Sequence, residues 1–485
     1  MPVWPWPALL TLLVTGAGLD SAQLWRDELA TWSAATRSVG DLVRLTGTID
    51  AATGPYYLLM HGWVTVFGDS VTALRLPAVL AMAAAAGLVA LLGQRLGDAR
   101  AGLLGGLLFA VLPGTSRYGQ EARPYALATF LAVLATLLLV EALRRPGWAR
   151  WAGYAAAVAA LGLTHLIALT LLAAHAVVVL AARRTPEGAG LPAAAATAEP
   201  VGGGGSWRRP LCWLLALVPA ALLVTPLVLA AARQRSRQLD WVDAARPEDL
   251  PALAGGVAQS GVVGGLLVGL AALGAARLGR RALLPGCAVL LPVLLVFAAG
   301  LAVPLWVPRY LVFVVPFAGL LAGAALAGVR LPAGLAVVAL AGLLGLPDQA
   351  ALRRTHEWPR SAPVDYRGAA GVVAAHQRPG DAVVYSPRES WLFLDLGLAY
   401  HLGDRRPDDV LVTRDQADRG DLWAAECDRP ARCLAGAERV WLVVAGRRAD
   451  PVAAVPGAKG AALRDGFTVE RVWPRPGLTV ALLTR

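Results

Sequence analysis

Two adjacent carboxylates, Asp27 and Glu28, follow the first apolar segment of the chain. A carboxylate held at a membrane surface beside a protein cavity can act as a general base toward a hydroxyl group, because removal from water makes it more basic. If this stretch is helical, Trp25, Leu29 and Trp32 share one face and Asp27 points away from it. The alternative is structural, since acids in the first turn of an interfacial helix are stabilised by the helix dipole. The spacing leaves both interpretations open.

Three arginines at the ends of apolar segments form the second candidate group. They are Arg75, Arg123 and Arg309. A charge in such a place is costly and usually has a partner. Pro124 suits the first turn of a helix, which puts Arg123 at a helix N-terminus, where a guanidinium can hold a phosphate with two hydrogen bonds. Three separated arginines at one membrane face therefore predict a lipid-phosphate site. An ion pair between Arg123 and Glu121 is the structural alternative.

Aromatic and polar residues near these groups complete the predicted site. Tyr56 and Tyr57 could stack on a sugar or a lipid, or could belong to the aromatic belt of the membrane interface. His165, at the end of an apolar segment, could contact a substrate or be a satisfied turn residue. We expect the substrate-binding residues to be Tyr56, Tyr57, Gln120, Glu121, Tyr125, His165 and Tyr310.

The composition is that of a membrane protein. Of the 485 residues, 57% are hydrophobic and only 16% are charged, far from the values of a soluble domain. The net charge of +11 would suggest nucleic acid in a soluble protein. Here the basic residues mostly flank apolar runs, as membrane-flanking residues do, so we expect a lipid bilayer as the partner and no nucleic acid.

Membrane helices must position the candidate residues, because long apolar segments recur up to residue 347. Each crossing of a bilayer takes about 20 residues. The first segment lacks a basic start and a small-residue cleavage site, so we expect it to be retained as a helix. The pattern predicts about eleven transmembrane helices, at 3–19, 71–94, 101–116, 125–143, 151–165, 166–182, 211–232, 253–276, 282–304, 311–329 and 332–347.

These helices make 1–347 one polytopic α-helical membrane domain. Arg-Arg pairs against helix ends at 144, 183, 208 and 280 favour an arrangement in which 20–70 is the first outer loop. In that arrangement 183–209, with its four-glycine run, is a flexible cytoplasmic loop. The positive-inside rule gives this orientation little support by itself, since the outer loops carry nearly as many arginines.

Residues 348–485 alternate polar and apolar segments and predict a soluble α/β domain. Helical spacing occurs at 365–377 and 391–401, and strand patterns occur at 381–385, 410–413, 440–445, 467–473 and 478–483. No glycine-rich phosphate loop follows these strands, so we assign the domain no nucleotide site. Cys427 and Cys433 are close enough in sequence to close a small loop if the domain faces an oxidising compartment.

Taken in order, these segments resemble bacterial membrane glycosyltransferases of the GT-C fold, the group that includes relatives of protein O-mannosyltransferases and the lipid A aminoarabinose transferase. The resemblance spans about 1–330. Its pieces are Asp27-Glu28, Pro55-Tyr-Tyr-Leu-Leu59, Phe67-Gly-Asp-Ser70, Ala73-Leu-Arg-Leu-Pro77, Gln120-Glu-Ala-Arg-Pro-Tyr125, Thr164-His165 and Pro308-Arg-Tyr310. Family members often have His-Pro-Pro before the paired tyrosines, where this chain has Thr53-Gly-Pro55. A role for that histidine is lost here or has moved.

The resemblance implies transfer of a sugar, with inversion, from a polyprenyl-phosphate donor to a glycan, lipid or protein acceptor outside a bacterial cytoplasmic membrane. Mannose is the favoured sugar and a pentose is next. Asp27 would be the catalytic base and Glu28 would support it or bind the acceptor, while Arg75, Arg123 and Arg309 would bind the donor phosphate. Some relatives hold a divalent ion, which stays possible at Asp27 and Glu28, although no His/Cys cluster has metal-ligand spacing.

Two other classes of function were weighed. A transporter or flippase of lipid-linked sugars predicts inverted repeats and charges deep in the membrane, whereas the charges here gather at one face and no repeat is convincing. A non-catalytic scaffold that presents the C-terminal domain predicts no group of carboxylates and arginines. The sequence favours the enzyme, with its active site and its C-terminal domain facing outward.

Overall fold

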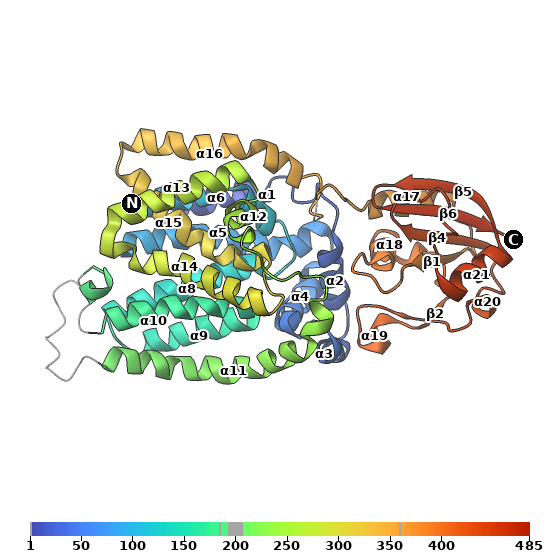
Figure 1. Ribbon diagram of the computed structural model, residues 1–485, viewed down its shortest axis with the longest axis horizontal. Helices are drawn as coiled ribbons and strands as arrows, with labels where there is room; N and C mark the ends of the chain where they lie inside the picture. The colour runs from blue at the N-terminus through green and yellow to red at the C-terminus, as the bar shows by residue number, and fades with distance from the viewer. Residues whose placement is uncertain (1, 184–185, 193–206, 358–359) are drawn as a thin grey trace. The chain divides into compact units, whose positions relative to one another are not determined.

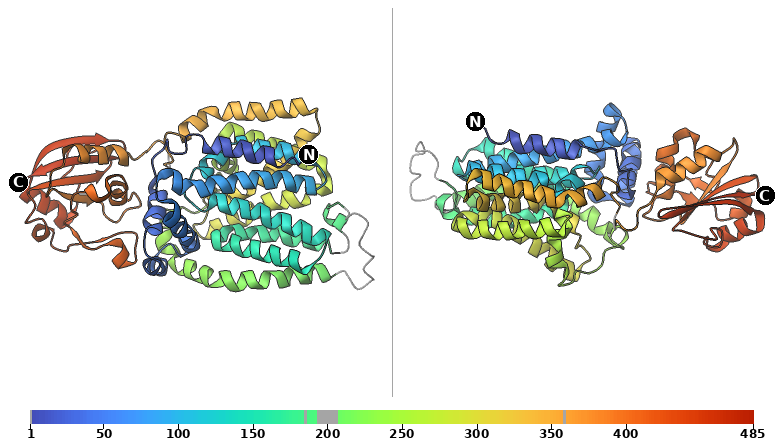
Figure 2. Two further views of the ribbon diagram at one scale, coloured as in Figure 1. Left: turned by 180° about the vertical axis from the view of Figure 1, so that it is seen from behind. Right: turned by 90° about the horizontal axis from the view of Figure 1, so that it is seen from above.

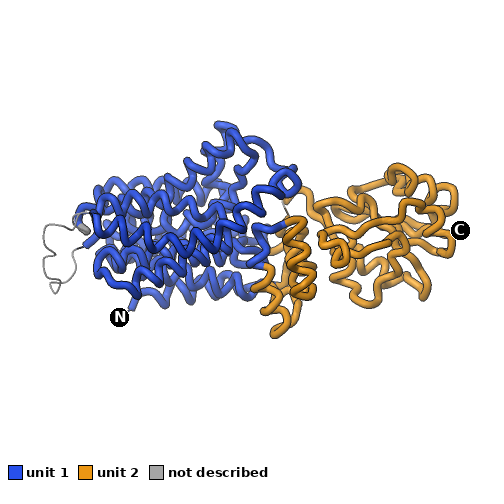
Figure 3. Tube along the Cα trace, turned by 90° about the horizontal axis from the view of Figure 1, so that it is seen from below, with its two compact units in different colours: residues 1–19, 50–56, 75–352 blue, residues 20–49, 57–74, 353–485 orange. Residues whose placement is uncertain are grey.

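The computed structural model describes residues 2–183, 186–192, 207–357 and 360–485. Its contacts divide the chain into two compact units, coloured separately in Figure 3. Unit 1 consists of Met1–Leu19, Asp50–Tyr56 and Arg75–Leu352, and unit 2 consists of Asp20–Ile49, Tyr57–Leu74 and Arg353–Arg485. The predicted first outer loop is therefore grouped largely with the C-terminal residues. Each unit is described by itself below.

Unit 1 is a bundle of apolar helices that lie side by side in both views of Figure 2. Its α-helices are α1 (Pro5–Gly16), α5 (Val71–Arg95), α6 (Ala99–Val111), α7 (Pro113–Gly119), α8 (Tyr125–Arg144), α9 (Trp148–Thr164), α10 (Leu171–Ala181), α11 (Arg208–Gln238), α12 (Asp249–Ala258), α13 (Gly261–Leu278), α14 (Leu283–Ala302), α15 (Val315–Ala327) and α16 (Leu331–Leu352). Short 3-10 helices are η1 (Ala51–Thr53), η2 (Leu166–Thr170), η3 (Pro186–Ala189), η4 (Gly279–Ala282) and η5 (Pro308–Val314).

The protein is a multi-pass membrane protein. Within the described ranges, six helical stretches are long and apolar enough to cross a membrane, or seven if α6 and α7, bent by 68° at their junction, form one span. The predicted number of about eleven spans is not confirmed by this test, because helices such as α1 and η2–α10 are apolar but short. The number eleven stays a prediction. Much of the predicted flexible loop 183–209 lies outside the described residues.

Two predicted helices are not continuous. The segment 253–276 is broken into α12 and α13, because Gln259 adopts a left-handed conformation (φ 57°) and the Ser260 side chain then caps α13 by accepting a hydrogen bond from the Val263 N–H. The segment 101–116 bends where Pro113 opens α7. A single helix over 253–276 was thus the wrong prediction, since apolar residues conceal a left-handed residue and a cap from a pattern of hydropathy alone.

Glycines let the bundle helices approach closely. A Cβ placed on Gly274 of α13 would lie 1.8 Å from the Leu321 carbonyl oxygen of α15, and one on Gly323 of α15 would lie 2.2 Å from the Ala101 carbonyl oxygen of α6. Small residues are favoured at such crossings in membranes because association there depends on backbone contact and dispersion. The sequence of α15 is therefore constrained on two sides, toward α6 and toward α13.

Unit 2 contains three helices from the N-terminal part of the chain and a small α/β region from the C-terminal part. The helices are α2 (Arg26–Ala35), α3 (Val39–Thr48) and α4 (Gly54–Phe67), which begins in unit 1. The C-terminal elements are α17 (Tyr366–His376), β1 (Ala382–Ser386), α18 (Leu394–Leu402), η6 (Gly403–Arg405), β2 (Val412–Arg414), α19 (Gln416–Arg419), β3 (Ala425–Glu426), α20 (Pro430–Cys433), β4 (Arg439–Ala445), α21 (Gly457–Gly466), β5 (Thr468–Arg475) and β6 (Leu478–Thr484).

The main sheet of unit 2 has four strands in the order β1-β4-β6-β5 (Figure 1). β1 and β4 are parallel, and β4, β6 and β5 pair antiparallel. Every residue of β1 is buried, as expected of a strand with both faces covered. The predicted strands and both predicted helices of this region are confirmed, apart from shifts of a few residues at their ends. A disulfide joins Cys427 and Cys433.

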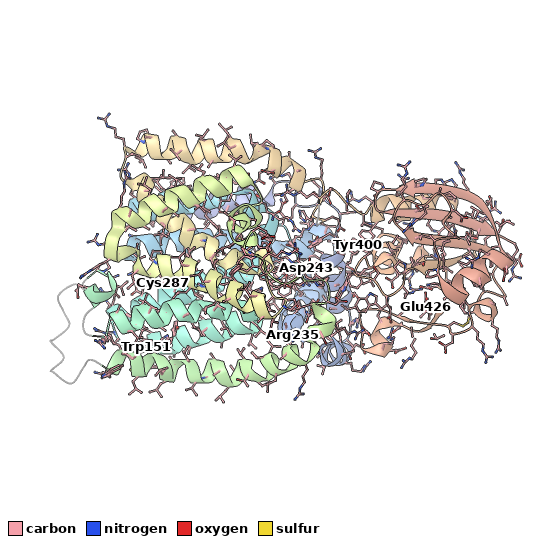
Figure 4. All side chains as sticks on the ribbon, viewed as in Figure 1. Trp151, Arg235, Asp243, Cys287, Tyr400 and Glu426 are labelled. Carbon is pink, nitrogen blue, oxygen red and sulfur yellow. A yellow bond between two sulfur atoms is a disulfide. The ribbon has the colours of Figure 1, made fainter. Side chains whose placement is uncertain are left out.

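A buried arginine fixes the loop that follows β1. The Arg388 guanidinium, only 6% exposed, pairs with Asp409 (2.7 Å), Glu426 (2.9 Å) and Asp395 (3.3 Å). Burial opposes its charge, but the carboxylates outweigh burial and raise the pKa of Arg388 above its usual value. Glu426, labelled in Figure 4, also accepts from Lys459 Nζ at 2.7 Å. The cluster ties α18, β3 and α21 to the end of β1.

The close contact of α13 with α15 gives the first prediction. We expect Gly274→Ala to lower the thermal stability of the detergent-purified protein, because overpacking against a backbone carbonyl costs roughly 1–3 kcal/mol. The matched control is Gly269→Ala on the same helix, where an added Cβ meets no atom within 4 Å. The control should be neutral or slightly stabilising, as alanine is the better helix former. Equal unfolding temperatures for the two variants would contradict the packing described here.

Candidate functional site

Helix α2 of unit 2 carries both predicted catalytic carboxylates in its first turn. The Glu28 side chain is fully buried, and its carboxylate accepts a hydrogen bond from the Trp25 N–H at 3.4 Å. It also lies 3.8 Å from His356 Nδ1. The predicted helix is thus present, and the Glu28 side chain caps its N-terminus. Asp27 is half-buried one residue earlier.

Residues that follow the last helix of the bundle lie beside Asp27 and Glu28, within unit 2. Arg26 Nε is 3.4 Å from Glu357 Oε2, and Glu357 is buried, with only 3% of its surface exposed. Tyr366 is also buried, and this burial raises its pKa well above the usual value. The negative charges of Glu357 and Asp27 raise the pKa further, and the positive charge of Arg26 lowers it. Sequence reasoning missed these partners, although an acid and a histidine directly after an apolar helix were a visible signal.

Arg37 fastens the far end of α2 to the C-terminal part of unit 2. Its guanidinium is 7% exposed and donates to the Asp421 carbonyl (2.8 Å), the Gln416 carbonyl (3.3 Å) and the Ser33 carbonyl (3.1 Å). Burial lowers the pKa of Arg37, and nearby groups including Tyr57 and Asp41 oppose that shift. Helix α2 is therefore held at its start by residues 356–357 and at its end by residues 416–421.

The middle of α2 has a further contact in the same unit. The Trp32 indole donates to Asp69 Oδ2 at 2.8 Å, and its ring meets Tyr400 of α18 edge-on, with ring centroids 5.3 Å apart. Tyr400 is labelled in Figure 4, and its hydroxyl donates to the Asp69 carbonyl at 3.2 Å. Trp32 thus belongs to a protein contact, and three separate attachments fix the helix that carries Asp27.

Unit 1 contains a pocket of about 330 Å³ that brings four of the predicted residues together. Arg123, Tyr125, His165 and Tyr310 all line it. Three polar residues that sequence reasoning did not select, Thr53, Arg235 and Gln238, line it as well. Arg235, labelled in Figure 4, projects from the last turns of α11. Its signal in the sequence was the run of arginines at 233, 235 and 237, which follows an apolar helix.

Arg309 lies next to this pocket, because it contacts Tyr125, which lines the pocket. Its Nε donates to the Tyr125 hydroxyl at 3.2 Å, and its guanidinium lies 5.0 Å from the centre of the Trp241 ring. The rings of Tyr125, His165 and Tyr310 meet pairwise at centroid distances of 5.7 to 6.4 Å. Arg123, Arg309 and Arg235 therefore bring positive charge to an aromatic-lined pocket, a combination suited to a phosphate attached to an organic group.

The remaining predicted residues of unit 1 hold the bundle together. Arg75 is fully buried and donates to the Leu19 carbonyl at 2.8 Å. Gln120 donates to the Thr15 and Ala17 carbonyls at 2.7 and 2.9 Å. The structure does not place Arg75 or Gln120 among the residues that line the pocket. Both donate to carbonyl groups of residues 15–19, in the last turn of α1 and the segment that follows it.

Glu121 and the paired tyrosines are also buried. The Glu121 carboxylate forms an ion pair with Arg117 at 2.9 Å. Tyr56 is 3% exposed and Tyr57 is fully buried. Aromatic belt residues face the lipid headgroups, so the belt interpretation of the two tyrosines is wrong. Asp27, Glu28 and Tyr57 belong to unit 2, and the other predicted site residues belong to unit 1.

No group of three or more His, Cys, Asp or Glu side chains within the described ranges is arranged to hold a metal ion. Asp27 and Glu28 differ in surroundings, because Glu28 is engaged at the helix end while Asp27 is half-buried.

Comparison with known proteins supports the family resemblance. The family model described as dolichyl-phosphate-mannose-protein mannosyltransferase matches residues 54–198. The structure is similar to ArnT from Cupriavidus metallidurans in the apo state, with a TM-score of 0.65 and 16% identity over 98% of this chain and 97% of that one. ArnT from the same organism bound to undecaprenyl phosphate gives a TM-score of 0.63 and 17% identity, with the same coverage. No curated protein sequence matches the chain.

These matches agree with the resemblance found in the sequence. The fold is that of the GT-C glycosyltransferases, the fold of ArnT, along nearly the whole chain. The family match includes Tyr56, Arg75, Arg123 and His165, but it ends before Arg309 and begins after Asp27. The roles of the individual residues are therefore proposals, made below.

The attachment of α2 through Arg37 gives the second prediction. We expect Arg37→Ala to speed hydrogen–deuterium exchange of the amides in 26–35 and 416–421, since several buried hydrogen bonds from one guanidinium are lost. Arg44→Ala is the control, because the Arg44 side chain is exposed and forms its ion pair with Asp41 on the same helix. Unchanged exchange in α2 of the Arg37 variant would show that the helix is held by other contacts.

Proposed function

We propose that this chain is an inverting membrane glycosyltransferase that moves a sugar from a polyprenyl-phosphate donor to an acceptor outside the cytoplasmic membrane. The observation that carries this proposal is the pocket of unit 1, in which Arg123 and Arg235 share an aromatic wall with His165 and Tyr310. A pocket of this kind fits a lipid phosphate that bears a sugar. The family match over 54–198 and the ArnT fold support the same class of reaction.

The donor is proposed from the relatives. ArnT has been solved with undecaprenyl phosphate, and the matching family model is named for the transfer of mannose from dolichyl phosphate to protein. A polyprenyl-phosphate sugar is therefore the proposed donor, with mannose favoured and a pentose next. The acceptor is a hydroxyl group of a glycan, a lipid or a protein.

Arg123, Arg309 and Arg235 would hold the donor phosphate. Positive charge around the phosphate stabilises the negative charge that grows on it as the sugar departs, and the fork of a guanidinium can bind two phosphate oxygens. Arg75 is proposed to take part as well, because its guanidinium has N–H donors besides the one that meets the Leu19 carbonyl.

Asp27 would act as the base. The oxygen of the acceptor hydroxyl attacks the anomeric carbon and forms a new C–O bond, while the bond from that carbon to the phosphate oxygen breaks and its electron pair leaves with the polyprenyl phosphate. The hydroxyl proton passes to the Asp27 carboxylate. Attack from the side opposite the phosphate inverts the anomeric configuration. Glu28 supports this role by fixing the first turn of α2.

The site is proposed to face outward from a bacterial cytoplasmic membrane. The disulfide between Cys427 and Cys433 supports this orientation of the C-terminal region, because disulfides persist in oxidising compartments. The three attachments of α2 to residues 356–357, 400 and 416–421 suggest what that region does. It would hold the helix of the catalytic base rather than carry chemistry of its own.

Asp27→Asn should abolish sugar transfer while leaving the protein folded in membranes. Loss of a general base typically lowers kcat by about 100-fold to 10,000-fold, and asparagine keeps the shape of the side chain. The measurement is transfer from radiolabelled polyprenyl-phosphate mannose, then from the arabinose donor, to extracted cell-envelope acceptors. Asp20→Asn, at an exposed position of the same outer segment, is the control.

Two results would count against this assignment. Wild-type activity in the Asp27 variant would remove Asp27 as the base. Movement of labelled donor across vesicle membranes, with no transfer and no effect of Asp27→Asn, would favour the transporter alternative.

Arg123→Ala should weaken binding of polyprenyl phosphate about 10-fold to 100-fold, as expected from the loss of a hydrogen bond between charged groups. Arg123→Lys should recover only part of the affinity, since lysine keeps the charge and loses the fork. Binding is measured by quenching of tryptophan fluorescence in nanodiscs. Arg233→Ala, on α11 outside the pocket, should bind normally. Equal affinity of all variants would place the phosphate elsewhere.

A further inference from the structure

Asp50, at the entrance to η1, holds an uncommon backbone conformation. Its φ is 62°, in the left-handed region that residues with a side chain rarely adopt, and it is only 6% exposed. Strained residues of this kind persist where the surrounding structure fixes them, and they gather at binding and active sites. Here the residues that follow, Ala52 and Thr53, line the pocket of unit 1.

The Asp50 carboxylate sets the direction of two pocket side chains. Its Oδ1 accepts a hydrogen bond from the Thr53 hydroxyl at 3.0 Å and another from the Gln238 side-chain amide nitrogen. An ionised carboxylate only accepts hydrogen bonds, so both partners must donate to it. One turn earlier on α11, Gln234 Oε1 accepts from the Ala51 N–H at 2.8 Å and anchors the same segment.

This arrangement determines what Thr53 and Gln238 can offer to a ligand. With its proton directed to Asp50, the Thr53 hydroxyl retains only lone pairs, and Gln238, with one amide proton directed to Asp50, retains its side-chain carbonyl oxygen and one further N–H. Both residues can therefore accept a hydrogen bond, and Gln238 can also donate one. A ligand that carries hydroxyl groups, which both donate and accept, matches this set.

A third group points to a polar ligand in the same pocket. His165 Nδ1 is buried and has no hydrogen-bond partner among the residues that the structure describes. A buried polar nitrogen left without a partner is costly, so such atoms in native proteins usually await a ligand or water. Arg123 and Arg235, which line the same pocket, supply positive charge.

We infer that Thr53, Gln238 and His165, ordered by Asp50, form the subsite that binds the hydroxyl groups of the donor sugar. This inference rests on the proposed function, in which Arg123 and Arg235 hold the phosphate of the same donor. The phosphate end and the sugar end of the donor are then recognised by different residues. Loss of the sugar subsite should weaken only ligands that carry a sugar.

The experiment compares two ligands on the full-length protein in nanodiscs. One is undecaprenyl phosphate, and the other is undecaprenyl-phosphate mannose, with the arabinose lipid as a second sugar-bearing probe. The variants are Thr53→Val, Gln238→Ala and Asp50→Asn. Asparagine tolerates the left-handed conformation, so Asp50→Asn keeps the backbone and one acceptor oxygen while it removes the negative charge that strengthens both hydrogen bonds. Arg233→Ala is the matched control from the same turns of α11.

We expect each subsite variant to raise the Kd of a sugar-bearing lipid about fivefold to tenfold, the size of one lost hydrogen bond. The Kd of undecaprenyl phosphate should stay within about twofold of the wild-type value. Arg235→Ala should weaken both ligands alike. Because each comparison uses one folded sample and two ligands, general unfolding of a variant would weaken both and cannot imitate the expected pattern.

The outcomes separate this inference from the proposed function. Subsite variants that bind both ligands like the wild type, or weaken both equally, would overturn the sugar subsite while leaving the lipid-phosphate site in place. A wild-type protein that binds the bare and the sugar-bearing lipids equally well would overturn it too. A wild-type protein that binds neither lipid would overturn the proposed function itself.

Discussion

A charged or strongly polar group at the edge of a bilayer has to be satisfied by the protein, because the surrounding lipid offers it nothing. Much of this structure follows from that constraint. Arg75 donates a hydrogen bond to the Leu19 carbonyl, Gln120 donates one to the Thr15 carbonyl, and Glu121 forms an ion pair with Arg117. The first two bonds join segments that are far apart in the sequence, and the third joins two neighbouring turns. Predicted site residues therefore also help to fix the helices around the pocket.

The polar groups at the pocket differ from Arg75 and Gln120 in the hydrogen bonds that they form. Arg75 and Gln120 are buried and donate to backbone carbonyls at 2.7 to 2.9 Å. Beside the pocket, the Asp50 carboxylate accepts hydrogen bonds from Thr53 and Gln238, and His165 Nδ1, in the pocket lining, lacks a partner in the described part of the chain. Because the protein already holds these acceptor groups in fixed directions, they lose less conformational entropy when a ligand binds.

Local patterns in the sequence predicted those features that depend on nearby residues. The helix that begins at Arg26, the strands β1, β2, β4, β5 and β6, and the meeting of Arg123, Tyr125, His165 and Tyr310 all follow from apolar periodicity or from segment ends placed at one face. Features that depend on distant residues escaped prediction. Glu357 reaches Arg26 across more than 300 residues of sequence, and Gln238 reaches Asp50 across 188. Nothing in a single sequence states such pairings, and neither a left-handed Gln259 nor a left-handed Asp50 alters the apolar pattern.

The segment 53–55, where this chain departs from the family that it resembles, can be given a physical interpretation. Where relatives often have a histidine and two prolines, this chain has a threonine, a glycine and one proline, and the threonine lines the pocket. A histidine can meet a ligand through a ring nitrogen. A threonine hydroxyl can donate or accept a hydrogen bond, and which of the two it offers a ligand depends on the neighbour to which it donates. Asp50 is that neighbour here, and it sets Gln238 in the same direction. If Thr53, Gln238 and His165 bind the sugar as inferred above, specificity for the sugar would depend on a carboxylate that does not itself line the pocket.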